Sequence, residues 1–505
     1  MFAKVYGSTT FGLQGMLITV EVDIANGIPG WDIVGLPDTS VRESRERVRA
    51  AIKNSGFEFP NRRITINLAP ADIKKDSAGL DLPIAVGILA ASGQISSNNC
   101  SDMLFVAELS LDGKLRPVAG VLSMAMNGIA CYLPSLFVAE ANAREALIAG
   151  DITVYAPQSL EQLVQHLRGE MLLQPCLSGI SKAEEEGYNE NFAEVQGQAT
   201  AKRALEIAAA GGHNVLMVGP PGSGKSMLAR RINTILPSMT RQEALEVTKI
   251  YSVAGIFQSH SIMMTRPFRS PHHTVSAAGM IGGGTVPRPG EVTLSHNGVL
   301  FLDELPEFPR IVLEVLRQPM EDGEVTISRV NASLSYPAKF IMIAAMNPCP
   351  CGYLGDPVKN CSCSDGEIRR YLKKISGPLL DRIDLHVQVP RPEYSELTAR
   401  KPAEDSRHIS RRVEAARQIQ VKRFQSSKIS CNAGMGHRHI RAMCQMAPEG
   451  QAILQQAFEK MNLSARSFDR ISKVARTIAD LAGDEIISAA HVAEAISFRN
   501  HMQNM

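Results

Sequence analysis

The segment "NVLMVGPPGSGKSMLARRINTIL" constrains the fold of this chain more than any other stretch. Its apolar run from Val215 to Val218 is typical of a buried strand, and an amphipathic helical pattern follows the motif. The motif itself comprises Gly219, Pro220, Pro221, Gly222, Ser223, Gly224, Lys225 and Ser226. A strand, a Gly-x4-Gly-Lys-Ser motif and a helix in this order are the context of a phosphate-binding loop.

The residue types of this loop suit the phosphates of a nucleotide. The glycines let backbone N–H groups close around the phosphates at a helix N-terminus, where the helix dipole favours anions. Lys225 would reach the β- and γ-phosphates, and the Ser226 hydroxyl would ligate Mg²⁺. We therefore expect ATP as the substrate and Mg²⁺ as a cofactor.

Two further apolar runs end in polar residues that suit the same chemistry. "GVLFLDELPEF" ends its strand pattern at Asp303 and Glu304, and "KFIMIAAMN" ends at Asn347. Asp303 would hold Mg²⁺, and Glu304 would polarise the attacking water. Asn347 would lie beside Glu304 if the two strands are neighbours, and its carboxamide could then orient the water. The alternative for Asp303 and Glu304 is a plain buried strand with a capping acid.

Composition limits the classes of protein that remain. A chain of 505 residues is too long for one hydrophobic core, which predicts two to four domains. The net charge of +2 and the aromatic content of 5% argue against a polybasic or stacking-based nucleic-acid binder, so such a role needs a local patch. No apolar run approaches the roughly 20 residues of a membrane span, so we expect a cytoplasmic protein without a membrane partner.

The pattern along the chain predicts four regions. Residues 1–168 are expected to form a mixed α/β domain, in which "MLITVEVDI" and "RRITINLA" are strands and "LDLPIAVGILAASG" is a buried helix from Leu80 to Ala91. The acidic, polar segment 169–190 is the expected linker. Alternating strands and helices predict a parallel sheet over 191–392, and 393–505 is expected to form a helical lid.

Arg382 and Arg466 each allow a purely structural and a functional interpretation. "ISGPLLDRIDLHVQV" places Arg382 between two acids, which is also the pattern of a surface ion pair. "LSARSFDRISKVARTIADLAG" places Arg466 on a helix, where a solvated charged face is the simple interpretation.

The motifs "GPPGSGKS", "GVLFLDE", "AAMNP", "GPLLDRIDL" and "LSARSFDRISKVARTIADLAG", in this order, resemble an AAA+ ATPase of the magnesium-chelatase-like group. The resemblance is to the YifB/ComM family and covers nearly the whole chain. It implies a homo-oligomeric ring, usually a hexamer, with ATP sites between subunits. It also implies that Arg382 is a finger reaching a neighbour's γ-phosphate, that Asn347 is a sensor, and that Arg466 is a lid sensor for its own subunit's nucleotide.

The ATPase core has room for two inserts, one in the long interval between Lys225 and Asp303 and one further along, just before the strand pattern that ends at Asn347. "FRSPHHTVSAAGMIGGGTVPRPGEVTL" contains a glycine run beside Arg288, and "GEVTISRVNASLSYPAKF" predicts a hairpin with Arg329 near its tip. In the family that the chain resembles, both inserts point into the pore of the ring. Arg288 and Arg329 would then hold DNA phosphates. An ordinary flexible loop is the alternative for the glycine run.

The segment "APADIKKDSAGLDLPIAVGILAASG" resembles the proteolytic domain of Lon, of the ribosomal S5 domain 2-like α+β fold, with Ser77 in the place of its nucleophile. The base of that family is a lysine, and "GKLRPVAGVLSMAMNG" offers none at the expected position. Lys114 lies in the turn before it, and Asp76 replaces the family's proline. Asp76 and Ser77 could instead cap the following helix. We expect a protease fold without protease activity.

Four of the nine cysteines cluster after Asn347, in "NPCPCGYLGDPVKNCSCS". Cys349, Cys351, Cys361 and Cys363 could form a tetrahedral thiolate site, for which structural zinc is the favoured ligand. Unliganded reduced thiols and a redox or iron–sulfur role are the alternatives. A metal here would staple the loop that leaves Asn347.

Together these features favour a Mg-ATP-dependent DNA motor that forms a ring. Following the family, it would act on single-stranded or branched DNA as a helicase or branch-migration motor during recombination of incoming DNA in natural transformation. A metal-insertion or chaperone-like ATPase and an ATP-dependent protease are the alternatives. The absence of a suitable lysine opposes the protease.

Overall fold

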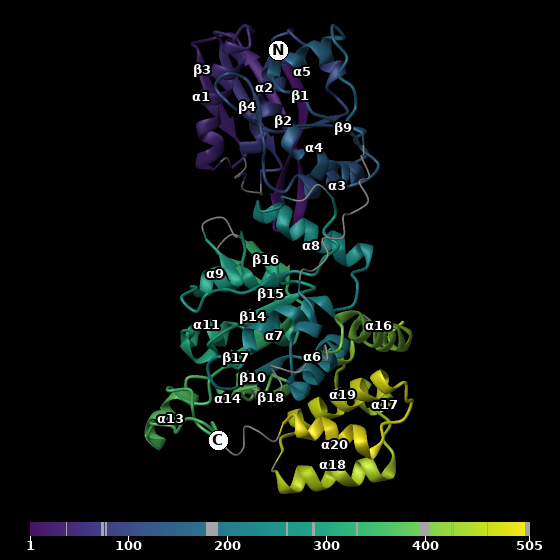
Figure 1. Cartoon of the computed structure of the whole chain (residues 1–505). Helices are drawn as coiled ribbons and strands as arrows, with labels where there is room; N and C mark the ends of the chain where they lie inside the picture. Colours follow the sequence, from purple (N-terminus) through teal and green to yellow (C-terminus); the bar gives the residue numbers. More distant parts are fainter. Residues whose placement is uncertain are drawn as a thin grey trace. The chain divides into compact units, whose positions relative to one another are not determined.

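The computed structural model describes residues 1–36, 38–71, 75, 78–177, 190–258, 261–284, 288–329, 332–392, 403–425, 427, 429–461 and 463–499. The chain divides into two compact units. The first consists of Met1–Glu184, Ala244–Met263 and Gly284–Arg288. The second consists of Glu185–Glu243, Met264–Gly283 and Pro289–Met505. Figure 1 labels many of the elements of both units.

The first unit is built on a mixed sheet of alternating buried and exposed side chains. In its described residues the strand order is β3-β4-β2-β1-β5-β8-β9. The strands are β1 (Phe2–Phe11), β2 (Gln14–Ala25), β3 (Gly30–Val34), β4 (Arg63–Ala69), β5 (Met103–Val106), β8 (Ser135–Val138) and β9 (Thr153–Tyr155). β1 and β2 pair antiparallel from Phe2 opposite Asp23 to Phe11 opposite Gln14. The predicted strands β2 and β4 are confirmed, because alternate residues such as Val20 and Val22 are fully buried.

Helices and two short strands complete the first unit. They are α1 (Thr39–Asn54), η1 (Ala78–Leu80), α2 (Asp81–Ala91), η2 (Ser97–Asn99), β6 (Glu108–Leu109), β7 (Leu115–Arg116), α3 (Val121–Ala130), α4 (Glu140–Leu147) and α5 (Leu160–Arg168). Every residue of α2 is buried, as its apolar composition predicts. The helix begins one residue later than expected, because Leu80 belongs to the preceding 3₁₀ turn.

Helix α8 (Arg241–Ala254) comes from the middle of the expected ATPase core but groups mostly with the first unit. Within that unit, Ser252 donates its hydroxyl to Glu145 Oε1 over 2.5 Å and accepts the Gly120 N–H at its carbonyl. Glu145 also accepts the backbone N–H of Leu122. The sequence pattern predicts one continuous unit over 191–392. It does not predict that α8, which lies within this range, groups with the first unit.

The second unit contains a parallel sheet of the order β11-β14-β17-β10-β18. These strands are β10 (Val215–Val218), β11 (Phe268–Arg269), β14 (Val299–Leu302), β17 (Ile341–Met346) and β18 (Leu385–Gln388). All neighbours in this sheet run parallel. β17 therefore lies between β14 and β10, and the carboxyl ends of these three strands meet at one edge.

Helices and hairpins surround this sheet. They are η3 (Phe192–Glu194), α6 (Ala199–Gly211), α7 (Lys225–Arg231), η4 (Ile232–Thr234), α9 (Ala277–Ile281), β12 (Gly282–Gly283), β13 (Arg288–Pro289), α10 (Glu291–Leu294), η5 (Leu305–Glu307), α11 (Arg310–Val315), α12 (Arg317–Asp322), β15 (Glu324–Arg329), β16 (Ala332–Pro337), α13 (Asp365–Leu372) and α14 (Gly377–Leu380). The predicted hairpin is confirmed as β15 and β16, which pair antiparallel from Glu324 opposite Pro337.

The C-terminal region is helical, as predicted. Its elements are α16 (Ser406–Arg423), η6 (Asn432–Gly434), α17 (His437–Met443), α18 (Pro448–Lys460), α19 (Ala465–Ala482) and α20 (Ala489–Ser497). α16 and α19 pack against α6, so one apolar core runs from the sheet into these helices. Asp480 is fully buried there and pairs with Arg423 and Arg476, which offsets the cost of burying its charge.

Candidate nucleotide site

The predicted phosphate-binding loop leaves β10 and enters α7. Gly222 and Gly224 have φ angles of +76° and +89°, in the left-handed region that favours glycine. A Cβ on Gly219 would lie 2.1 Å from the carbonyl oxygen of Val389, so only glycine fits there. Sequence and backbone thus agree that these positions of the loop require glycine.

Lys225 is buried at the base of this loop. Its Nζ donates to the carbonyl oxygens of Gly219 over 2.6 Å and Pro220 over 2.9 Å, and lies 3.3 Å from Asn347 Oδ1. Burial lowers the pKa of the ammonium. The charge is held by weak carbonyl acceptors, which phosphate oxygens can replace with stronger charge-assisted bonds.

The acidic pair at the end of β14 faces the loop. Ser226 donates its hydroxyl to Asp303 Oδ2 over 2.6 Å, which brings together two oxygen ligands of the kind that Mg²⁺ prefers. Glu304 follows with a φ of +52°, which is uncommon for a residue other than glycine. Its side chain is 60% exposed, so the carboxylate is accessible to water.

Asn347 follows β17 directly and therefore lies between the loop and the acidic pair. A cavity of about 400 Å³ opens at this point. It is lined by Pro221, Gly222, Ser223, Gly224, Lys225, Ser226, Met227, Asp303, Glu304, Met346 and Asn347. Seven predicted nucleotide-site residues thus line one cavity together with Glu304 and Asn347. Asn347 lies close to the acidic pair, as expected, because β17 is the neighbour of β14 in the sheet.

His273 is a residue of this site that the sequence analysis left without a role. Its Nδ1 lies 3.5 Å from Glu304 Oε2, and its ring packs beside the ring of His272 with centroids 4.1 Å apart. His273 follows β11, the strand beside β14. In the sequence, His273 is a polar residue shortly after a strand. This pattern assigns His273 to the site only when the order of the strands in the sheet is known.

Arg382 and Arg466 do not line this cavity. Arg382 is 6% exposed, its Nη2 pairs with Glu321 of α12, and its Nη1 donates to the Pro378 carbonyl over 2.6 Å. The pKa of Glu321 is lowered, first by Arg382 and also by the charges of Arg466 and Arg470. Arg466 itself is exposed. The structure therefore pairs Arg382 with Glu321, and neither predicted arginine is among the described residues that line the nucleotide cavity.

The two candidate DNA contacts are only partly described. Arg288 is exposed at the start of β13. Arg329 is the last residue of β15, and its side chain lies outside the described part of the chain, as do residues 330 and 331.

The four clustered cysteines converge on one point. Their sulfur atoms all lie within 4.8 Å of one another. Cys349 Sγ is 3.4 Å from Cys351 Sγ and 3.6 Å from Cys361 Sγ. The backbone N–H groups of Tyr353 and Ser362 lower the pKa of Cys351 to about 5, which favours its thiolate.

The features expected of a protease are only partly visible. Asp76 and Ser77 lie outside the described residues. Lys114 is exposed and pairs with Asp112 over 3.2 Å, and Ser123 donates its hydroxyl to the Leu13 carbonyl. Lys75, which the sequence analysis passed over, is fully buried and donates to the carbonyl oxygens of Gly35 and Pro70.

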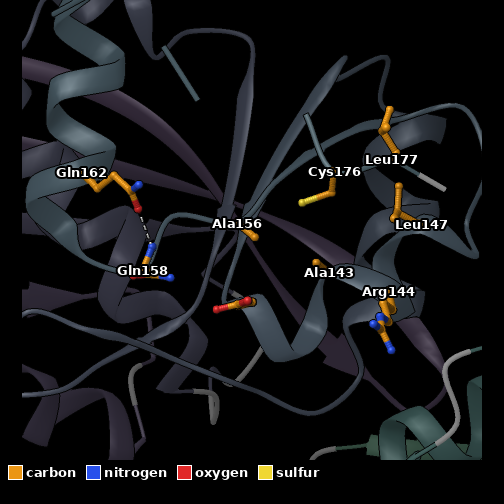
Figure 2. A pocket seen from close by; sticks show the side chains of 9 residues that line it. Ala143, Arg144, Leu147, Ala156, Gln158, Gln162, Cys176 and Leu177 are labelled. Atoms are coloured by element: carbon orange, nitrogen blue, oxygen red, sulfur yellow. Dashed lines mark hydrogen bonds between the residues drawn. The ribbon is translucent and has the colours of Figure 1, made fainter. Parts of the chain in front are cut away.

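The first unit also contains an open cavity of about 330 Å³, shown in Figure 2. Helix α4 contributes Ala143, Arg144 and Leu147, and α5 contributes Gln162, which accepts the Gln158 N–H over 2.8 Å. Its lining combines aliphatic and amide groups with the Cys176 thiol and the side chains of Glu140 and Arg144, a mixture that indicates no particular class of ligand.

Comparison with known proteins decides the family. Models of magnesium chelatase subunit ChlI match residues 191–397 and 20–142, and a model of the ChlI C-terminal region matches 403–499. The chain is 44% identical over 503 residues to "Competence protein ComM" of Haemophilus influenzae, covering 98% of this chain and 97% of that protein. It is likewise 44% identical over 500 residues to "Uncharacterized protein YifB" of Escherichia coli K12, covering 98% and 96%.

The chain belongs to the YifB/ComM family of magnesium-chelatase-like AAA+ proteins. The predicted membership and the α/β fold class are thereby confirmed. A chelatase protein itself is a more distant relative: the magnesium-chelatase 38 kDa subunit of Rhodobacter capsulatus is 25% identical over 219 residues, covering 40% of this chain and 56% of that protein. In the described part of this YifB/ComM family member, no helix is both long and apolar enough to cross a membrane.

Proposed function

We propose that this protein is a ring-forming ATPase that uses Mg-ATP to move branched or single-stranded DNA, as in branch migration during recombination of incoming DNA. The observation that carries the proposal is the near full-length identity with a protein named for competence, together with an assembled nucleotide cavity. The ring, its hexameric size, the DNA substrate and a cytoplasmic location are parts of this proposal.

The residues of the cavity suggest a division of labour. Lys225 would exchange its carbonyl acceptors for the β- and γ-phosphates of ATP. Ser226 and Asp303 would hold Mg²⁺, whose charge would stabilise the phosphates during hydrolysis. Glu304 would accept the proton of the attacking water, and Asn347 would orient that water.

The arginines and the thiols complete the proposed site. Arg382 would act on the nucleotide of a neighbouring subunit, because it pairs with Glu321 and does not line the cavity of its own chain. Arg466 would sense the nucleotide of its own subunit. Arg288 and Arg329 would contact DNA phosphates in the pore. A Zn²⁺ ion at the four cysteines would be structural.

A metal-insertion or protein-remodelling ATPase is the second candidate, favoured by the names of the matching family models. Against it, the chelatase subunit aligns with less than half of this chain. A Lon-like protease has less support, since Lys114 is exposed and held by Asp112.

The rate of ATP hydrolysis separates these candidates. The purified protein is assayed without DNA, with single strands and with a branched junction, and Glu304→Gln serves as the control. Stimulation by DNA that disappears in the variant supports the motor. A rate that is indifferent to every DNA would contradict it and would direct the search to a protein client.

A further inference from the structure

The cysteine cluster and the nucleotide cavity share one loop. Residues 347–364 connect β17 to α13, beginning at Asn347 in the cavity and ending at Ser364. Ser364 and Glu367 form a capping box that fixes the start of α13. The four cysteines lie between Asn347 and this capping box. A group that binds all four sulfur atoms would therefore also restrict the position of Asn347.

The sulfur positions suit one tetrahedral metal ion. A Zn–S distance of about 2.3 Å gives a tetrahedron with edges of about 3.8 Å. The separations among Cys349, Cys351 and Cys361 are 3.4, 3.5 and 3.6 Å, close to that edge and far from a disulfide bond. An iron–sulfur cluster would place several atoms between the sulfurs and so requires wider spacing.

Backbone groups support the sulfurs as they do in thiolate metal sites. The N–H of Cys351 donates to Cys363 Sγ over 3.4 Å, and the N–H of Cys363 donates to Cys361 Sγ over 3.4 Å. Such outer hydrogen bonds orient the ligands and stabilise their negative charge. Without an ion, bringing four thiols to one point would cost chain entropy with little in return.

Gly352 links the cysteine cluster to the nucleotide site through its contacts. Its N–H donates to the Cys349 carbonyl over 3.0 Å, so it lies within the turn that presents the first two sulfurs. A Cβ on Gly352 would lie 2.6 Å from Pro221 Cδ and 3.7 Å from Asn347 Cγ. The turn is thus packed against the phosphate-binding loop and against the carboxamide of Asn347.

We propose that Cys349, Cys351, Cys361 and Cys363 bind one Zn²⁺ ion, and that this ion controls nucleotide affinity by pressing the Gly352 turn against Pro221 and fixing Asn347. The proposal rests on the proposed nucleotide site. When the ion is lost, the loop between β17 and α13 relaxes, and one wall of the cavity loses its support.

The first test measures metal and needs no enzymatic activity. The full chain is purified under reducing conditions, and zinc and iron are quantified per chain. We expect one zinc per chain in the wild type and in Cys131→Ser, which removes an exposed thiol elsewhere. We expect none in the double variant Cys361→Ser/Cys363→Ser. Iron in place of zinc, or no metal together with four freely reacting thiols, would overturn the proposal.

The second test measures the affinity for a fluorescent ATP analogue. The double variant and the chelator-stripped wild type should each bind about tenfold more weakly than the zinc-loaded wild type, a change that one lost contact can produce. Re-adding zinc should restore the wild type. Gly352→Ala keeps all four ligands, so it should retain zinc yet bind the analogue more weakly, because its methyl group collides with Pro221 and its φ of +85° is unfavourable for alanine.

Unchanged affinity in the stripped wild type and in Gly352→Ala would overturn the control of the nucleotide site. Zinc-dependent affinity in a protein whose hydrolysis ignores DNA would support this inference while contradicting the proposed DNA motor. The two failures are therefore distinguishable.

Discussion

At the scale of single residues, the polar side chains of the cavity are paired with the backbone and with one another. Lys225 is bonded to carbonyl groups, and the Ser226 hydroxyl is bonded to Asp303. Glu304 has a left-handed backbone, which costs roughly 1–2 kcal/mol for a residue with a Cβ. Strain at such a position is retained where it aims a side chain, and here it aims a carboxylate at the cavity.

Glu304→Gln should lower the rate of ATP hydrolysis by about 10²- to 10⁴-fold, because the amide cannot accept the proton of the attacking water. The affinity for ATP should change little, since Lys225 and Ser226 remain. Turnover and nucleotide affinity are measured separately. Glu307→Gln is a matched control, because that carboxylate is exposed and pairs with Lys374. Equal losses in both variants would contradict the role of Glu304.

His273→Ala should lower turnover by roughly tenfold, which is less than the about 10²- to 10⁴-fold of a general base, because His273 would only position that base. The Nδ1 of His273 is close enough to Glu304 to hold its carboxylate in one orientation. His273→Asn should recover part of the loss, because an amide can donate a similar hydrogen bond. His272→Ala, which removes the neighbouring exposed ring, is the control. A His273→Ala variant with normal turnover would exclude the positioning role.

At the scale of elements, what could be predicted depended on local pattern. The strands β10 and β14 and the loop after β10 follow from four-residue apolar runs and a spaced motif, so Lys225, Ser226 and Asp303 could be assigned. The position of β17 between β14 and β10 is a property of the sheet, and no local pattern encodes it. For the same reason His273 could not be paired with Glu304.

Helix α8 shows the same limit more clearly. Ala244, Val247 and Ile250 give it a helical apolar stripe, and all three are buried. The stripe predicts a helix. It does not predict which part of the protein packs against the helix, because any apolar surface could bury the stripe. The contacts of Ser252 with Glu145 and Gly120 show that α8 packs in the first unit, and these contacts join residues distant in sequence.

Arg47→Met should destabilise the first unit by about 3 kcal/mol, the cost of leaving a buried carboxylate without its partner. Arg47 contacts both oxygens of Asp81, over 2.8 and 3.1 Å. Burial raises the pKa of Asp81 to about 6 even with this partner. Denaturant unfolding measures the loss. The double variant Arg47→Met/Asp81→Leu should regain most of it, and a double variant as unstable as the single one would contradict this account.

At the scale of the whole molecule, the proposed ring would complete the catalytic site. Arg382 is buried against Glu321, and no arginine is among the described residues that line the nucleotide cavity. In the proposed ring, the cavity of one subunit would face an arginine of its neighbour across a head-to-tail interface. Glu321 would then hold Arg382 until a γ-phosphate of the neighbour competes for it.

Mixing two inactive variants tests this arrangement. Arg382→Ala keeps an intact cavity, and Glu304→Gln keeps an intact arginine, so an interface between them contains every required group. In a ring assembled at random from equal amounts, about one interface in four has the productive order, and the mixture should recover up to about a quarter of the wild-type rate. Steady-state ATP hydrolysis after co-assembly measures the recovery.

The matched control mixes Glu304→Gln with Lys225→Ala, which damages the same cavity. An interface of that mixture always has a defective cavity, so its rate should stay at the level of the separate variants. Recovery in the first mixture should also disappear on dilution, because the productive interface exists only in the assembled state. No recovery at any mixing ratio, with assembly demonstrated by size, would mean that Arg382 does not act on the neighbouring subunit's nucleotide.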